Sequence, residues 1–197
     1  MTDPLFEADD DANTPLTPEG RQGLIPTYIT TRAELNEAEQ ENIAEADRWA
    51  FSRKRGDVVD VDFLMDLHRR MLRQVWRWAG AQRTSELNIG GPSHRIAVDL
   101  HTLVGDVRHW IDHQTFAPDE IAVGFHHRLV SIHPFPNGNG RHARLAADLL
   151  IKQLGGQRFT WGRANLVEAA QTRRDYVQAL QAADAHDIAP LLAFARS

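Results

Sequence analysis

The chain has 197 residues, of which 42% are hydrophobic, and a formal net charge of -5 at pH 7. This length and apolar fraction suit one folded domain with a sizeable core. The negative net charge excludes the broad basic surface of a DNA- or RNA-binding protein, so any phosphate binding must be local. No apolar run is long enough to span a membrane, and the acidic first residues do not resemble a signal peptide. The absence of cysteine excludes disulfides and thiolate metal sites and fits a cytoplasmic protein.

The first predicted elements are a tail and two helices. Residues 1–22 are rich in Asp, Pro and Thr without periodicity, which predicts a mobile N-terminal tail. A helix is expected from Thr31 to about Lys54, because Thr31 and Glu34 have the spacing of a capping box. A second helix is expected after Asp62, with apolar residues at helical spacing until Gly80 stops it.

A β-hairpin is predicted next. Residues 85–89 and 94–98 flank the turn sequence Gly90-Gly91-Pro92-Ser93, and Asp99 is expected to cap a helix that follows to about Gln114. An isolated hairpin is marginal without packing, so this signal is weak.

The remaining elements are predicted to be helical. Pro118 opens a helix to about Ser131, another runs from about Asn139 to Leu154, and two or three short helices follow. The expected fold is mainly α, a helical bundle with a short β-hairpin. Its expected parts are the tail, an N-terminal segment over residues 23–56, and the main domain over residues 57–197 with its C-terminal helices.

The most informative segment is residues 132–144, with the sequence IHPFPNGNGRHAR. Glycine in the Gly-Asn-Gly turn allows close approach of the backbone to a ligand. A helix that begins there presents free N–H groups, which favour anions. Arg141 and Arg144 then share one helical face and offer donor forks suited to phosphate. The segment therefore predicts a polyphosphate site with His133 at its edge.

This segment resembles the signature of Fic-domain proteins, His-x-Phe-x-(Asp/Glu)-Gly-Asn-Gly-Arg-x-x-Arg. Trp78-Ala79-Gly80 followed by Arg83 also resembles the segment that precedes the flap hairpin in Fic proteins. The resemblance covers residues from about 61 to 153 and implies the Fic fold. It further implies transfer of part of a nucleotide, most often AMP from ATP, to a hydroxyl of a Ser, Thr or Tyr in a target protein.

The resemblance implies a role for each matching residue. His133 would accept the hydroxyl proton, since histidine titrates near neutrality. Phe135 would be a buried anchor of the loop. The phosphates would be held by backbone N–H groups, the Asn139 amide and two arginines, a set comprising Gly138, Asn139, Gly140, Arg141 and Arg144.

Asn137 departs from the signature, because the family usually has an acid there to hold Mg²⁺. Magnesium prefers anionic oxygen ligands, so we expect metal binding through Asn137 to be weak or indirect. Slower AMP transfer, a different nucleotide or leaving group, and a lost activity all stay open.

Two further features of Fic proteins have counterparts here. A flap hairpin usually pairs with an extended target segment by β-augmentation, and Ile89 and Ile96 would clamp the target. Many members also carry an inhibitory helix with the pattern (Ser/Thr)-x-x-x-Glu-(Gly/Asn). Glu41-Asn42 matches its last two positions, so Glu41 is expected to contact Arg144 and inhibit. An ordinary surface hairpin and a solvated acidic helix are the alternatives.

The leading hypothesis is a Fic-type AMP transferase with ATP and Mg²⁺ as substrate and cofactor. The chain also resembles the bacterial subgroup called mobile mystery protein B, which implies a helix-turn-helix protein as a possible genetic partner. The alternatives are transfer or hydrolysis of another phosphate-containing group, and a catalytically silent module that binds a nucleotide or a partner.

Overall fold

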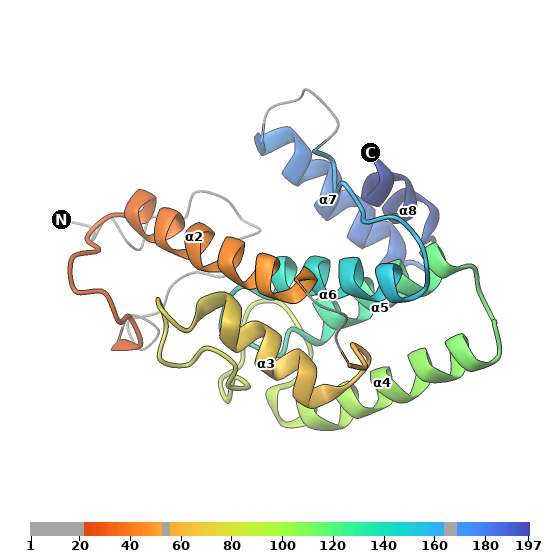
Figure 1. The fold of residues 1–197 in the computed structure, drawn as a ribbon, viewed down its shortest axis with the longest axis horizontal. Helices are drawn as coiled ribbons and strands as arrows, with labels where there is room; N and C mark the ends of the chain where they lie inside the picture. The colour runs from red at the N-terminus through yellow and green to blue at the C-terminus, as the bar shows by residue number, and fades with distance from the viewer. Residues whose placement is uncertain (1–21, 53–55, 164–168) are drawn as a thin grey trace.

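The computed structural model describes residues 22–52, 56–163 and 169–197, and these residues form a bundle of helices (Figure 1). The predicted tail lies outside the described residues except for residue 22. Within the described part of the chain, no helix is long and apolar enough to cross a membrane.

Helix α2 (Arg32–Phe51) begins at the predicted capping box. The Thr31 hydroxyl accepts from the Glu34 N–H at 3.3 Å, and the Glu34 carboxylate accepts from the Thr31 N–H at 3.0 Å. The helix packs against α3 (Val61–Leu72). Asn42 links the two, because its side chain donates to the Arg70 carbonyl and accepts from the Gln74 N–H.

Helix α3 ends at Leu72, earlier than the expected stop at Gly80. Residues 73–80 form turns instead, since their backbone pairs with the strand-like residues 23–25. The Ile25 N–H donates to the Val75 carbonyl, and the Arg77 N–H donates to the Gly23 carbonyl, both at 2.8 Å. Backbone groups used in this pairing cannot continue a helical ladder.

The predicted β-hairpin is wrong. Residues 93–95 form a 3-10 turn that leads directly into α4 (Ile96–Asp112), and no strand forms over residues 84–92. The helical period prevails because Ile96, Leu100, Leu103 and Val107 all face the core with at most 1% exposure. Ile96 is therefore a core residue rather than part of a flap.

Helices α5 (Pro118–Ile132) and α6 (Asn139–Gln153) pack side by side at the centre of the bundle (Figure 1). Helix α4 packs against α5. On another side of α5 lies α8 (Ala189–Arg196), which packs in turn against α7 (Ala169–Asp184). The close packing uses small side chains, since Ala143, Ala146 and Ala147 on α6 are completely buried. The loop between α5 and α6 is the motif segment, so the core fixes both of its ends.

Candidate active site

The motif loop connects α5 to α6 through two left-handed residues. His133 ends α5 with φ 54° and ψ 60°, and Gly138 precedes α6 with φ 81°. Asn139 closes the loop between them. Its side-chain oxygen accepts from the Phe135 N–H at 2.9 Å, and its amide donates to the Phe135 carbonyl at 2.8 Å. Asn139 is 3% exposed, and these two hydrogen bonds shape the loop; the role of its amide as an extra ligand donor stays a prediction.

The buried side chain of His68 packs against this loop. Phe135 is completely buried, as expected of an anchor, and its ring stacks on His68 with centroids 3.6 Å apart. His68 Nδ1 accepts from the Gly80 N–H at 3.0 Å, so the ring proton lies on Nε2 and is donated to the Asn137 carbonyl at 3.0 Å. Burial holds the pKa of His68 well below its ordinary value, which keeps this neutral form. The ring therefore ties the motif loop to the turn after α3.

His133 lies at the edge of a cavity and is 6% exposed. Burial lowers the pKa of its imidazole to about 4, with a further contribution from the charge of Arg83. The ring is therefore neutral at physiological pH. Gly90 packs so closely on this residue that a side chain there would collide with the Cβ of His133.

Arg83 holds the backbone around His133. Its side chain is 1% exposed, and it donates to the carbonyls of His133 at 2.7 Å, Ser85 at 2.9 Å and Gly91. Its own N–H donates to the Pro134 carbonyl. The loop of residues 84–92 is thus fastened to the motif by one buried guanidinium.

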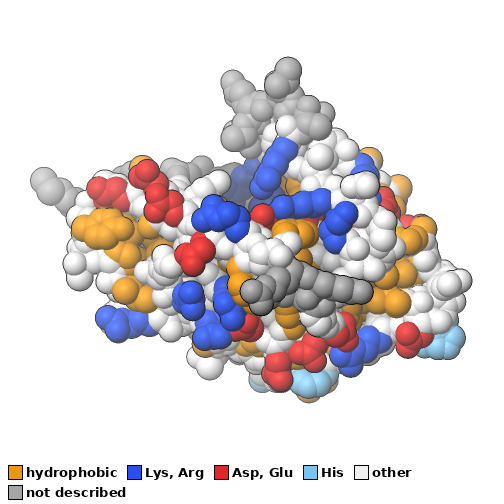
Figure 2. Space-filling model, in the orientation of Figure 1, with side chains coloured by type: hydrophobic (Ala, Val, Ile, Leu, Met, Phe, Trp, Pro, Cys, Tyr) orange, Lys and Arg blue, Asp and Glu red, His pale blue; other side chains and the backbone are white. Residues whose placement is uncertain are grey.

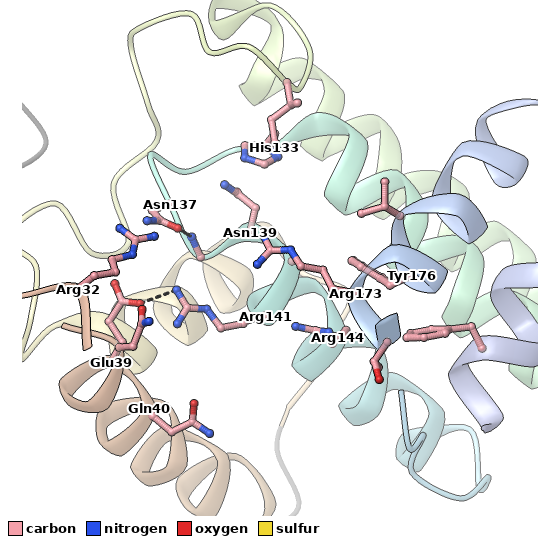
Figure 3. Close-up of a pocket in the computed structure, with 17 residues that line it drawn as sticks. Arg32, Glu39, Gln40, His133, Asn137, Asn139, Arg141, Arg144, Arg173 and Tyr176 are labelled. Atoms are coloured by element: carbon pink, nitrogen blue, oxygen red, sulfur yellow. Dashed lines mark hydrogen bonds and ion pairs between the residues drawn. The ribbon is translucent and has the colours of Figure 1, made fainter. Parts of the chain in front are cut away.

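The cavity has a volume of about 660 Å³ and lies between α2, the motif loop, the start of α6, α7 and α8. Figure 3 shows His133, Arg141, Arg144 and Arg173 arranged around it. Asn137, Gly138, Asn139 and Gly140 form part of its wall, and Ile89 reaches it from the loop of residues 84–92. On the surface, Figure 2 shows basic side chains gathered between α2 and α7. The structure thus brings together all of the motif residues expected at the site except the buried Phe135.

Helix α2 contributes the acidic side chain of this cavity. Glu39 pairs with Arg141 at 2.6 Å (Figure 3), and its other oxygen accepts from the Trp76 indole N–H at 2.7 Å. Glu41 is exposed and forms no ion pair with Arg144, so the expected Glu41–Arg144 contact is wrong. Two positions along a helix turn a side chain by about 200°, which places Glu39 and Glu41 on opposite faces.

Arg144 lies beside Tyr176 of α7, with its guanidinium carbon 5.2 Å from the ring centroid. Burial lowers the pKa of Arg144, and the positive charges of Arg141 and Arg163 lower it further. Tyr176 in turn forms a 3.1 Å hydrogen bond with His126, which is completely buried. Arg144 therefore lies against an aromatic ring, with the positive charges of Arg141 and Arg163 and the negative charge of Asp148 nearby.

Asn137 uses its side-chain oxygen within the loop. Oδ1 accepts from the Gly138 N–H at 2.6 Å, while the Asn137 carbonyl accepts from His68. No group of three or more His, Asp or Glu side chains suited to a metal ion occurs in the described part of the chain. The residues present thus fit a resident divalent cation poorly.

Sequence reasoning missed several residues of this cavity. Glu39, Arg32, Arg173 and Tyr176 line it but lie outside the motif. Nothing in their local sequence distinguishes them from other charged or aromatic residues of amphipathic helices. Arg83 carried a signal, since it follows Trp78-Ala79-Gly80 at the spacing noted above, but its role as a backbone clamp needed the structure.

Comparison with known proteins agrees with this geometry. Protein adenylyltransferase Fic of Aedes aegypti is 30% identical over 144 residues, which cover 71% of this chain and 28% of that protein. Protein adenylyltransferase fic-1 of Caenorhabditis elegans is 28% identical over 145 residues, covering 72% and 27% respectively. The chain thus spans little more than a quarter of the length of these curated relatives.

Solved structures share the fold. A Fic-1 structure from C. elegans is 26% identical with a TM-score of 0.64, over 85% of this chain and 53% of that one. The BepC protein of Bartonella tribocorum, solved with bound AMPPNP, is 15% identical with a TM-score of 0.67, over 95% of this chain and 93% of that one. The family model described as Fic/DOC matches residues 58–151, which hold the motif loop and both of its supporting helices. Residues 58–151 of this chain therefore form a Fic domain of the Fic/DOC family.

Proposed function

We propose that this chain is a Fic-type nucleotidyltransferase that transfers AMP from ATP to the hydroxyl of a Ser, Thr or Tyr in a target protein. The observation that carries this proposal is the shared cavity: His133 lines the same space as the first turn of α6 and two motif arginines. A proton acceptor and a phosphate cradle are the two parts that this reaction needs. The names of the adenylyltransferase relatives support AMP as the transferred group.

In the proposed reaction, the target hydroxyl oxygen attacks the α-phosphorus of ATP. The new oxygen–phosphorus bond forms as the bond to the oxygen that bridges the α- and β-phosphates breaks, and pyrophosphate leaves with that oxygen. The hydroxyl proton passes to His133, which is neutral before the reaction because its pKa is lowered. Nearby phosphate charge raises the proton affinity of the ring, so the cation formed is stabilised by the bound nucleotide.

The phosphates would rest on the start of α6. The first N–H groups of a helix have no partner within the helix, so those of Asn139 and Gly140 are available to phosphate oxygens. The Gly138 N–H is already used by Asn137 Oδ1, so Gly138 contributes through its left-handed turn rather than as a donor. Arg141 and Arg144 would hold the outer phosphates. Removal of one such donor typically raises the barrier by about 3 kcal/mol.

Magnesium is the cofactor that the sequence resemblance implies, and it would supply positive charge to the phosphates if it were bound. Asn137 and the nucleotide phosphates are the groups that would hold it, but Asn137 is uncharged and its side-chain oxygen is engaged. The proposed reaction therefore has no step that depends on the metal.

Helix α2 is the proposed regulator, with Glu39 in place of Glu41. The Glu39–Arg141 pair occupies a guanidinium that the phosphates would need. ATP binding would have to displace this carboxylate, so the pair lowers nucleotide affinity. The proposed target-docking segment is the loop of residues 84–92, where Ile89 is 39% exposed and borders the cavity. The expected helix-turn-helix partner rests on the sequence resemblance alone.

A labelled-nucleotide assay tests the proposal. The full chain is incubated with ATP labelled at the α-phosphate and with a lysate as the source of targets, next to His133→Ala. Label on protein with the wild type and none with His133→Ala would support AMP transfer. A parallel incubation uses ATP labelled at the γ-phosphate. Label on protein from this ATP alone, lost in His133→Ala, would point to transfer of another phosphate-containing group. ATP binding without label on any protein, also after Glu39→Gln, would favour a silent binding module.

A further inference from the structure

We propose that this cavity binds the triphosphate of its nucleotide as the metal-free anion, with arginine side chains in the place of a divalent cation. The inference rests on the proposed function, because it takes ATP as the ligand. It concerns how the phosphate charge is neutralised, which the reaction class does not settle.

The first argument is the absence of an available acidic ligand. Among the described residues that line the cavity, Glu39 is the one carboxylate. One of its oxygens is paired with Arg141 at 2.6 Å and the other accepts from Trp76 at 2.7 Å. The side chain is 4% exposed, so it is held in this arrangement by its surroundings. A cation would have to compete with a guanidinium for this acid.

The second argument is the state of Asn137, at the position where the family signature has an acid. Both of its oxygens accept hydrogen bonds: Oδ1 from the Gly138 N–H at 2.6 Å and the carbonyl from His68 at 3.0 Å. Magnesium demands nearly ideal octahedral geometry and hard anionic oxygens. A neutral amide that shapes its own loop supplies neither.

The third argument is the positive charge that is already present. Arg32, Arg141 and Arg144 line the cavity, and the one carboxylate among its described lining residues is that of Glu39. The Nε atom of Arg32 is buried and has no hydrogen-bond partner among the described residues. A buried donor without a partner is costly, and a small shift of the Arg32 side chain towards a phosphate in the cavity would give it one. The same guanidinium groups repel a cation, so the cavity favours an anion with several charges and disfavours Mg²⁺.

A binding experiment with the full chain separates the possibilities. The dissociation constant of ATP is measured by calorimetry in excess Mg²⁺ and again in excess EDTA. We expect the dissociation constant of ATP in EDTA to be lower than that in Mg²⁺ or at most about threefold higher. Binding that weakens tenfold or more in EDTA would overturn the inference while leaving the proposed reaction intact. Binding in neither condition would overturn both, and metal-free binding without any AMP transfer would overturn the proposed reaction alone.

Variants test the residues named. Arg32→Gln should weaken ATP binding in EDTA by about tenfold, whereas Arg174→Gln, a change on the exposed face of α7, should leave it unchanged. Asn137→Asp should weaken metal-free binding and make the affinity rise on addition of Mg²⁺. Equal effects of Arg32→Gln and Arg174→Gln, or metal-independent binding in Asn137→Asp with undiminished affinity, would contradict the arginine assignment.

Discussion

The ion pair between Glu39 and Arg141 makes a sharp prediction about nucleotide affinity. In Glu39→Gln, the amide oxygen can still accept from the Trp76 indole N–H, but the charge opposite Arg141 is lost. Because the substitution keeps the shape of the side chain, the packing of α2 on α3 should persist. The change therefore isolates the electrostatic effect of the pair from the structural effect of the helix.

The magnitude follows from burial. The Glu39 side chain is 4% exposed but that of Arg141 is 32% exposed. A charged hydrogen bond in the interior contributes about 1.5–3 kcal/mol, whereas an exposed pair contributes about 0–1 kcal/mol. A pair with one partly hydrated partner lies between these values, at about 1 kcal/mol. Freed of this competition, ATP should bind about fivefold more tightly to Glu39→Gln than to the wild type.

Glu41→Gln is the matched control, because it removes the same charge from the same helix on its exposed face. Calorimetric titration with ATP should show the gain in affinity for Glu39→Gln and no change for Glu41→Gln. Thermal unfolding of both variants checks that the fold is retained. An unchanged affinity in Glu39→Gln, or an equal gain in both variants, would refute the assignment of Glu39 as the residue that competes with phosphate.

Three other predictions concern the motif loop. The pKa of His133 in the free protein is lowered to about 4, so the ring loses its proton-accepting form only near that pH. The value of kcat/KM for AMP transfer, which reports the free protein, should therefore differ by less than about twofold between about pH 5.5 and pH 8. A tenfold loss at about pH 5.5 in a protein still folded by circular dichroism would indicate an ordinary histidine pKa near 6.5 and contradict the described environment. Gly138→Ala combines a φ of 81° with a new Cβ 2.8 Å from Leu72 Cδ1, and should lower the free energy of unfolding by about 2 kcal/mol. Gly155→Ala is the control, because Gly155 has a φ of 84° but no heavy atom within 4 Å of a new Cβ. Chemical denaturation should show that it lowers the free energy of unfolding by only about 1 kcal/mol. Equal losses in the two variants would rule out the clash with Leu72. Arg83→Met leaves three carbonyls without the donor that Arg83 provides, and it should lower the free energy of unfolding by about 2–4 kcal/mol. A loss below about 0.5 kcal/mol would show that the hydrogen bonds of Arg83 are not needed to hold the loop.

Buried histidines also set the acid stability of the fold. Burial lowers the pKa of His126 to about 3 and those of His133 and His142 to about 4. The unfolded chain binds protons at these side chains near pH 6.5, before the folded chain does, so stability falls as the pH decreases from about 6.5 towards 4. Above that window the three side chains are neutral in both states and stability no longer depends on them.

The sequence predicts local features of this fold well. The capping box of Thr31 and Glu34, the proline that opens α5 and the glycine pair after α6 act within a few residues, so their signals need no tertiary information. The motif loop belongs to the same class, because its left-handed Gly138 and its helix start are encoded side by side.

Packing decided the features that the sequence did not reveal. Residues 94–98 alternate in a way that is compatible with a strand, yet Ile96 belongs to a helical series whose other members, Leu100 and Leu103, lie downstream of the predicted hairpin. In α2, several glutamates lie close together, and only contact with α6 selects Glu39 as the partner of Arg141. Such choices depend on which face of a helix is covered, which local spacing leaves open.

Asn137 and Glu39 are best understood together. An acid at position 137 would be the second carboxylate, after that of Glu39, among the described residues that line the cavity, and it would offer Arg141 or Arg144 an internal partner. With asparagine there, the loop keeps its hydrogen bond to the Gly138 N–H, and no second carboxylate joins the described residues that line the cavity. Glu39 then remains as the one acid that α2 brings to the cavity among the described residues, and its partner is the first arginine of the motif. Displacement of the Glu39 carboxylate from Arg141 would therefore free this guanidinium for a ligand, so the position of that side chain and the affinity for phosphate should be coupled.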